Sequence, residues 1–129
     1  MENSVKLYGT VLFSGKFDPV HPGHIASVLR LLKKCRNVLV VMLDYPERRY
    51  PACYCVDIFE EIFDGLPVEV IVNNDHFGKI TKEQLEKFNF DVYASGNLSV
   101  LRHIENLGFD VIFAERSYLY EASQIPVPK

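Results

Sequence analysis

The chain has 129 residues, the length of one typical domain, and a chain of this length buries about two-thirds of the surface that it exposes when unfolded. Its hydrophobic content of 48% and charged content of 24% are ordinary for a folded protein, and its net charge of -3 argues against a nucleic-acid partner. No apolar run approaches the roughly 20 residues of a membrane span, and the first residues lack the basic and apolar segments of a leader. We therefore expect a single cytoplasmic domain over residues 1–129, with neither nucleic acid nor membrane as a partner.

Strands and helices are predicted to alternate along the chain, because apolar runs typical of strands alternate with apolar residues at helical spacing. In chain order, the pattern predicts a strand over 6–14, a helix over 22–34, a strand over 37–43, a loop over 44–54, a helix over 56–63, a strand over 67–72, a loop over 73–80, a helix over 81–88, a strand over 91–95, a helix over 98–107 and a strand over 109–115. Thr81 is expected to cap the third helix, and Gly108 to close the fourth. Two prolines and two arginines make the first of these loops irregular.

Five strands in alternation with helices imply an α/β fold: a single Rossmann-like domain with a five-stranded parallel sheet and helices on both faces. Ligands of such sheets bind outside the carboxyl ends of the strands, where the strand order reverses. The end of the first strand usually lies beside that point, so we expect the functional site there.

The stretch that follows the first strand, "GKFDPVHPGH" (15–24), combines titratable side chains with proline and glycine breaks. His21 and His24 are three residues apart and share one face of the first turn of a predicted helix. A helix N-terminus attracts phosphate through its unsatisfied N–H groups, and imidazole can donate a hydrogen bond to a phosphoryl oxygen during transfer. The dinucleotide fingerprint, the phosphate loop and the nucleophile elbow are absent, so phosphoryl chemistry is the best interpretation.

Three cysteines, Cys35, Cys53 and Cys55, form an odd set without the spacing of a disulfide framework. Reduced thiols in a cytoplasmic protein are the simplest interpretation, and Cys53 with Cys55 as half of a metal site is the alternative. We predict no metal bound by the protein's own side chains.

The 15–24 stretch resembles the signature of the nucleotidyltransferases that carry a His-x-Gly-His motif, a superfamily that includes the class I aminoacyl-tRNA synthetases. Three further segments also resemble parts of that family: "RRYPACYCVDIFEEI" with "LPVEVIV", "ASGN", and "ERSYLYEASQI". The small size and the spacing from Arg116 to Ile125 most resemble the short cytidylyltransferases that activate glycerol phosphate or phosphoethanolamine.

The resemblance implies transfer of a nucleoside monophosphate, preferably CMP, from a nucleoside triphosphate to a phosphorylated small-molecule acceptor, with release of pyrophosphate. It also implies Mg²⁺, bound mainly through the triphosphate, and a homodimer. An adenylyltransferase that uses ATP and a non-catalytic nucleotide-binding protein of the same fold are the alternatives.

Roles follow from the resemblance residue by residue. The implied catalytic residues are His21, His24, Lys16 and Arg116; the implied nucleotide-binding residues are Gly15, Phe17, Asp18, Gly23, Gly96, Asn97 and Ser123; and the implied acceptor-binding residues are Arg48 and Arg49. A solvated charged loop is the alternative for the last two.

Several positions depart from the family pattern or have other interpretations. Lys16 replaces a serine or threonine. Asp18 is expected to orient its loop or a neighbouring side chain by hydrogen bonding, with direct ligation of a metal as the alternative. The closing segment departs most, at Glu121, Ala122 and Pro126, and this keeps the non-catalytic alternative open. His76 is interpreted as an exposed loop residue, with contact to the acceptor as the alternative.

Overall fold

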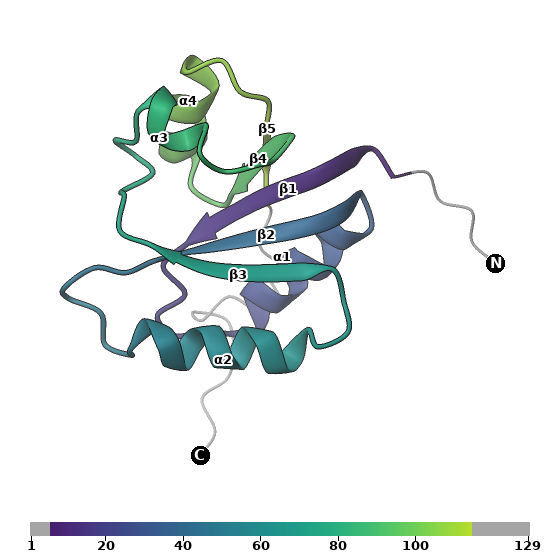
Figure 1. The fold of residues 1–129 in the computed structure, drawn as a ribbon, viewed down its shortest axis with the longest axis vertical. Coiled ribbons are helices and arrows are strands. Elements are labelled where there is room, and N and C mark those ends of the chain that lie inside the picture. Colours follow the sequence, from purple (N-terminus) through teal and green to yellow (C-terminus); the bar gives the residue numbers. More distant parts are fainter. Residues whose placement is uncertain (1–5, 115–129) are drawn as a thin grey trace.

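A computed structural model describes residues 6–114 of the chain. Its elements are β1 (Tyr8–Gly15), α1 (Pro22–Leu32), β2 (Cys35–Leu43), α2 (Ala52–Ile62), β3 (Val68–Asn73), α3 (Lys82–Leu85), β4 (Val92–Ser95), α4 (Leu98–Asn106) and β5 (Val111–Phe113). The strands form one parallel sheet in the order β3-β2-β1-β4-β5 (Figure 1). The predicted α/β class and the five-stranded parallel sheet are therefore confirmed.

The sheet separates two apolar cores, because successive side chains of a strand point to opposite faces. On one face, Val11 and Phe13 of β1 pack in a cluster that includes side chains of α1 and α2. On the other face, Leu12 and Tyr93 pack in a cluster that includes side chains of α3 and α4. Helices thus lie on both faces, as predicted, and they hold the carboxyl ends of the central strands in place.

The helix ends follow local sequence signals. Pro22 stands at the start of α1, where its missing N–H is not needed. Thr81 caps α3 by accepting a hydrogen bond from the N–H of Gln84 at 3.1 Å. Gly108 follows α4 with a φ of 101°, a conformation that favours glycine. The predicted start of the first helix at residue 22, the predicted cap at Thr81 and the predicted end at Gly108 are confirmed.

Two predicted helices, those over 56–63 and 81–88, differ most from the structure. The helix predicted over 56–63 begins at Ala52, so the predicted loop 44–54 ends earlier. Pro51 has a φ of −56° and leads into this helix, since a proline is tolerated at a helix entrance. The helix predicted over 81–88 is only Lys82–Leu85, because residues 86–88 turn and bring the Phe88 ring within 6.0 Å of the Phe77 ring.

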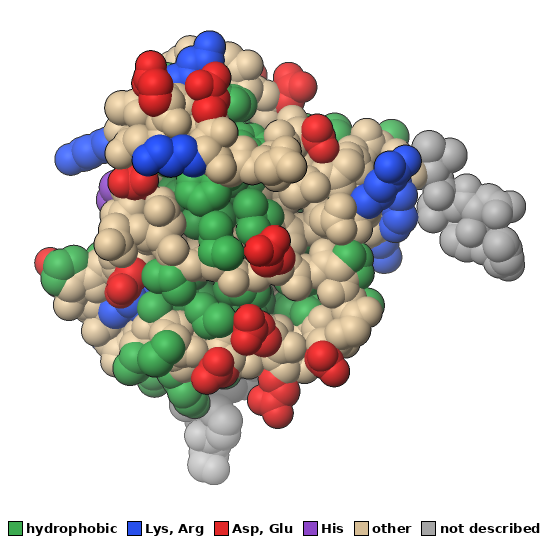
Figure 2. All heavy atoms as spheres, in the orientation of Figure 1, with side chains coloured by type: hydrophobic (Ala, Val, Ile, Leu, Met, Phe, Trp, Pro, Cys, Tyr) green, Lys and Arg blue, Asp and Glu red, His purple; other side chains and the backbone are tan. Residues whose placement is uncertain are grey.

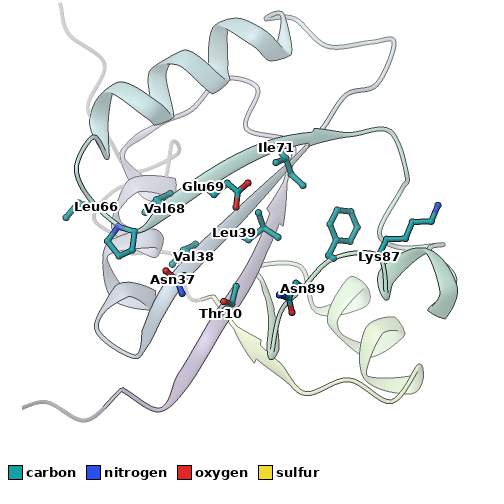
Figure 3. A pocket seen from close by; sticks show the side chains of 12 residues that line it. Thr10, Asn37, Val38, Leu39, Leu66, Val68, Glu69, Ile71, Lys87 and Asn89 are labelled. Atoms are coloured by element: carbon teal, nitrogen blue, oxygen red, sulfur yellow. The ribbon is translucent and has the colours of Figure 1, made fainter.

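The helices leave part of the second face uncovered. A hollow of about 550 Å³ lies there over β2 and β3, and Leu39, Ile71 and Glu69 point into it (Figure 3). Apolar side chains reach the surface in this region of the molecule (Figure 2). The hollow lies away from the carboxyl end of β1, and among the described residues its lining includes neither histidine nor arginine, so it is not the predicted phosphate site.

None of the helices between residues 6 and 114 has both the length and the hydropathy that crossing a bilayer requires.

Candidate active site

A cavity of about 610 Å³ opens at the carboxyl ends of β1 and β4, the neighbouring strands at which the strand order reverses. Its lining includes most of the predicted site residues: Gly15, Lys16, Phe17, Asp18, His21, His24, Arg49, Gly96 and Asn97. Gly23 is buried within α1, and Arg48 contacts the backbone of the neighbouring loops. The predicted residues Arg116 and Ser123, like the tail positions Glu121, Ala122 and Pro126, lie outside the described residues.

The two histidines form the N-terminal cap of α1. The N–H of Gly23 donates to Nδ1 of His21 at 3.0 Å, and the N–H of His21 donates to Nδ1 of His24 at 3.2 Å. The two rings lie 3.9 Å apart between centroids, with an interplanar angle of 30°, and both line the cavity. The first turn of α1 therefore determines the position of both imidazoles.

This cap also selects a tautomer. A ring nitrogen that accepts a hydrogen bond carries no proton, so in each neutral imidazole the proton is on Nε2. Each histidine then has an N–H donor at the opposite side of its ring from the helix backbone. Two such donors at a helix N-terminus match the acceptor oxygens of a phosphate.

Phe17 supports His24 from the apolar side. Its backbone has a φ of 48°, which is unusual for a residue other than glycine, and its ring is buried. The ring packs edge-on against His24 and Phe59, with centroids 4.6 Å and 5.0 Å away. A Cβ at Gly15 would lie 2.9 Å from the ring, so glycine is needed there for Phe17 to fold back. Gly15 and Phe17 thus shape the cavity by packing.

Asp18 joins the first loop to the loop after β2. Its Oδ2 accepts from the N–H of Arg49 and from the Tyr45 hydroxyl, both at 2.8 Å, and its Oδ1 accepts from the N–H of Tyr50 at 2.8 Å. The N–H of Arg49 is the largest influence on the pKa of Asp18, and with the Tyr45 hydroxyl, the Tyr50 N–H and the charge of Arg48 it outweighs partial burial and lowers that pKa. The loop-orienting interpretation of Asp18 agrees with this geometry.

The lowered pKa of Asp18 predicts a pH dependence. A carboxyl group with a lower pKa in the folded state stabilises the fold above its unfolded pKa, and this contribution is lost as the pH falls through the folded pKa. The difference in unfolding free energy between the parent and Asp18→Asn should be constant near neutrality and should shrink below about pH 4. Urea titrations at several pH values test this, with the exposed Asp57→Asn as the control. A difference that stays constant down to pH 2 would contradict it.

Arg48 also joins the loop after β1 to the loop after β2. Its guanidinium donates to the carbonyl oxygens of Leu43 and Phe17 at 2.8 Å and 3.0 Å, and its Nε donates to the carbonyl of Tyr50 at 2.8 Å. A further bond joins it to the carbonyl of Lys16. These donors serve the backbone, so Arg49 is the arginine of this loop that lines the cavity.

Asn97 caps α4 while it lines the cavity. Its Oδ1 accepts from the N–H groups of Ser99 and Val100 at 3.0 Å and 3.3 Å. The amide nitrogen is therefore the polar atom that its side chain has left to offer a ligand.

The described lining of the cavity favours an anion. It carries two cationic side chains, Lys16 and Arg49, and its one carboxylate, Asp18, already accepts the three hydrogen bonds given above. Between residues 6 and 114, no group of three or more histidine, cysteine or acidic side chains is arranged to hold a metal. Cys53 is exposed and Cys55 is buried. The described residues therefore do not form a metal site of their own.

The polar residues of the lining that had no predicted role in binding the nucleotide include Ser14, Tyr45, Ser95 and His76. Tyr45 lies under the Lys16 ammonium, which is 5.1 Å from the ring centroid. His76 is exposed, as interpreted, but it also lines the cavity, and its Nδ1 accepts from the N–H of Gly78 at 3.2 Å. No local signal marks these residues, because they come from loops and strands that meet only in the folded chain.

Solved structures similar to this chain include two of a bifunctional NMN adenylyltransferase/ADP ribose pyrophosphatase from Francisella tularensis. The one complexed with AMP and a manganese ion has a TM-score of 0.65 and 17% sequence identity, and the match covers 86% of this chain and 38% of that one. The second has a TM-score of 0.61 and 16% identity, with 85% and 38% covered. The chain thus spans less than two-fifths of those proteins, and at this identity the likeness concerns the fold.

No curated protein was found to match the chain. The model of the Cytidylyltransferase-like family matches residues 12–120, a range that contains the carboxyl end of β1, both cavity histidines and the β4 end of the site. By this match over most of its length, the chain belongs to the Cytidylyltransferase-like family.

Proposed function

We propose that the protein is a nucleotidyltransferase that transfers a nucleoside monophosphate, preferably CMP, from a nucleoside triphosphate to a phosphorylated small-molecule acceptor. A phosphate oxygen of the acceptor attacks the α-phosphorus, and a new P–O bond forms. The bond between the α-phosphorus and the bridging oxygen breaks, and pyrophosphate leaves with the electron pair. Catalysis of such a transfer requires mainly positioning and stabilisation of charge.

The observation that carries this proposal is the pair of imidazoles at the start of α1. Their Nδ1 atoms accept backbone hydrogen bonds, so the proton of each neutral ring is on Nε2, from which it can be donated to a phosphoryl oxygen. Lys16 and Arg49 add positive charge to the same cavity. Charge that develops on the α-phosphoryl oxygens and on the leaving pyrophosphate would be stabilised there.

The acceptor phosphate is assigned to Arg49 and Lys16, since the donors of Arg48 serve backbone carbonyls. The predicted catalytic role of Arg116 and the nucleotide-binding role of Ser123 remain part of the proposal, as do the homodimer, the cytoplasmic location and the single domain over 1–129. Mg²⁺ would arrive on the triphosphate and neutralise its charge, because the cavity's one described carboxylate accepts hydrogen bonds from the loop.

Two alternatives stay in view. An adenylyltransferase that uses ATP draws support from the likeness in fold to a protein solved with AMP. A nucleotide binder without turnover would use the same cavity. Pyrophosphate release, measured with the four nucleoside triphosphates against a panel of phosphorylated alcohols and sugars, separates the three. Pyrophosphate release that requires both CTP and a phosphorylated acceptor supports the proposal. Tight nucleotide binding with no pyrophosphate release from any combination of nucleotide and acceptor contradicts it.

CTP is expected to bind about 10-fold more tightly than ATP, the effect of one additional hydrogen bond. The side chain of Asn97 has its Oδ1 on the helix, so it offers a base only donors. Cytosine has two adjacent acceptors on its pairing edge, whereas adenine has one. Asn97→Ser keeps a capping oxygen and removes the amide, so it should abolish the preference and leave the melting temperature nearly unchanged. Calorimetric titration of the parent and of Asn97→Ser with CTP and with ATP tests this. Tighter binding of ATP than of CTP by the parent would favour the adenylyltransferase.

A further inference from the structure

Three buried hydroxyl groups lie close to where β1 and β4 end. The Tyr93 hydroxyl is hydrogen-bonded to the Ser14 hydroxyl. The N–H of Asn97 donates to Oγ of Ser95 at 3.1 Å. Tyr93 has no exposed surface, while Ser14 and Ser95 are 8% and 5% exposed and both line the cavity.

The hydrogen bond between Ser14 and Tyr93 uses only one of the two hydroxyl protons. Burial raises the pKa of Tyr93 well above its usual range, so the phenol keeps its proton at any physiological pH. When the phenol donates to Ser14, the Ser14 hydroxyl has its own proton left for the cavity.

Ser95 has a different partner, because its oxygen accepts from the N–H of Asn97 at the start of α4. Ser14 is the serine that is hydrogen-bonded to Tyr93.

We propose that the Ser14 hydroxyl is a further ligand-binding group, which donates to a phosphate oxygen of the bound nucleotide, and that Tyr93 is the positioning residue that orients it. Ser14 ends the buried part of β1 and is followed by Gly15 and Lys16, so its donor lies in the cationic part of the cavity. The Phe77 ring stacks on Tyr93 at 5.6 Å with an interplanar angle of 15°, and so limits the movement of the phenol. The identity of the ligand rests on the proposed function.

Titration calorimetry with inorganic triphosphate, CTP and ATP tests the assignment. Ser14→Ala is expected to weaken all three by about 10-fold, because it removes a hydrogen bond to a charged group. Tyr93→Phe, which keeps the shape of the core, is expected to weaken them by about 3-fold, since the Ser14 hydroxyl remains but loses its orientation. Ser95→Ala is expected to have the smallest effect of the three.

Thr10→Ala is the matched control, because it removes a hydroxyl from the same face of β1 at the far end of the strand. Its affinity for triphosphate should equal that of the parent. A larger loss in Ser95→Ala than in Ser14→Ala would overturn the assignment. Parent-like affinity in both Ser14→Ala and Tyr93→Phe would also overturn it, whatever their melting temperatures.

Failure of the proposed function gives a different result. If the parent binds inorganic triphosphate and nucleotide but releases no pyrophosphate with any acceptor, the transfer reaction is wrong, and the Ser14 series still decides the role of that hydroxyl. If the parent binds neither, the Ser14 proposal is wrong as well.

Discussion

Replacing either cavity histidine with alanine should lower turnover by about 10² to 10⁴, the range expected when one acid–base or electrostatic donor is removed. Both rings line the cavity, and the backbone of α1 holds each with its proton on Nε2. His21→Ala and His24→Ala therefore remove donors already oriented for the transition state. Steady-state release of pyrophosphate measures the loss.

Stability has to be separated from catalysis in these variants, because the same imidazoles cap α1. Loss of the cap should cost about 1 kcal/mol of unfolding free energy. His21→Ser provides the control, since serine can cap the helix but cannot replace the imidazole donor. Its melting temperature should return toward that of the parent while its turnover stays low. Parent-like turnover in folded His21→Ala or His24→Ala would remove the central claim of the proposed function.

Arg48→Ala should be the most destabilising single change in the site loops, by about 2–4 kcal/mol, or a fall of about 10 °C in melting temperature. The guanidinium donates to carbonyl oxygens of the loop after β1 and of residues 43–50, and its bonds to Leu43 and Phe17 are part-buried. Without it, these acceptors lose their partner and the loops that carry Lys16 and Arg49 lose their common support. Nucleotide and acceptor affinities should fall together with stability.

Two further variants show whether the hydrogen-bond geometry of the Arg48 guanidinium or its positive charge is responsible for the loss of stability. Arg48→Lys keeps the charge but cannot reach several carbonyls from one point, so it should recover only a minor part of the loss. Arg102→Ala removes an equal charge from an exposed position of α4 and should leave the melting temperature within about 2 °C of the parent. A direct acceptor contact instead predicts that Arg48→Ala weakens acceptor binding with little effect on melting.

Some of the site could be predicted from the sequence, because it depends on neighbours in the chain. His21 and His24 share a helical turn whatever surrounds them, and Pro22 marks where that turn starts. The alternation of strands and helices likewise implied the parallel sheet and placed the 15–24 stretch at its carboxyl edge. The boundary of α2 was misjudged because a proline can end a regular element or begin one.

By itself, then, the sequence determined the α/β class, the order of the elements and the stretch that carries the histidines, since these follow from periodicity and short-range breaks. Only the tertiary structure decided the roles of groups whose partners are distant in the chain. Arg48 and Arg49 are adjacent, yet the guanidinium of Arg48 donates to four backbone carbonyls, whereas that of Arg49 donates to the carbonyl of Asp18 and lines the cavity. The hydroxyl groups of Ser14 and Tyr93 are hydrogen-bonded although the two residues are 79 positions apart in the sequence. A side chain's free donors depend on what the fold places beside it, and no local pattern records that.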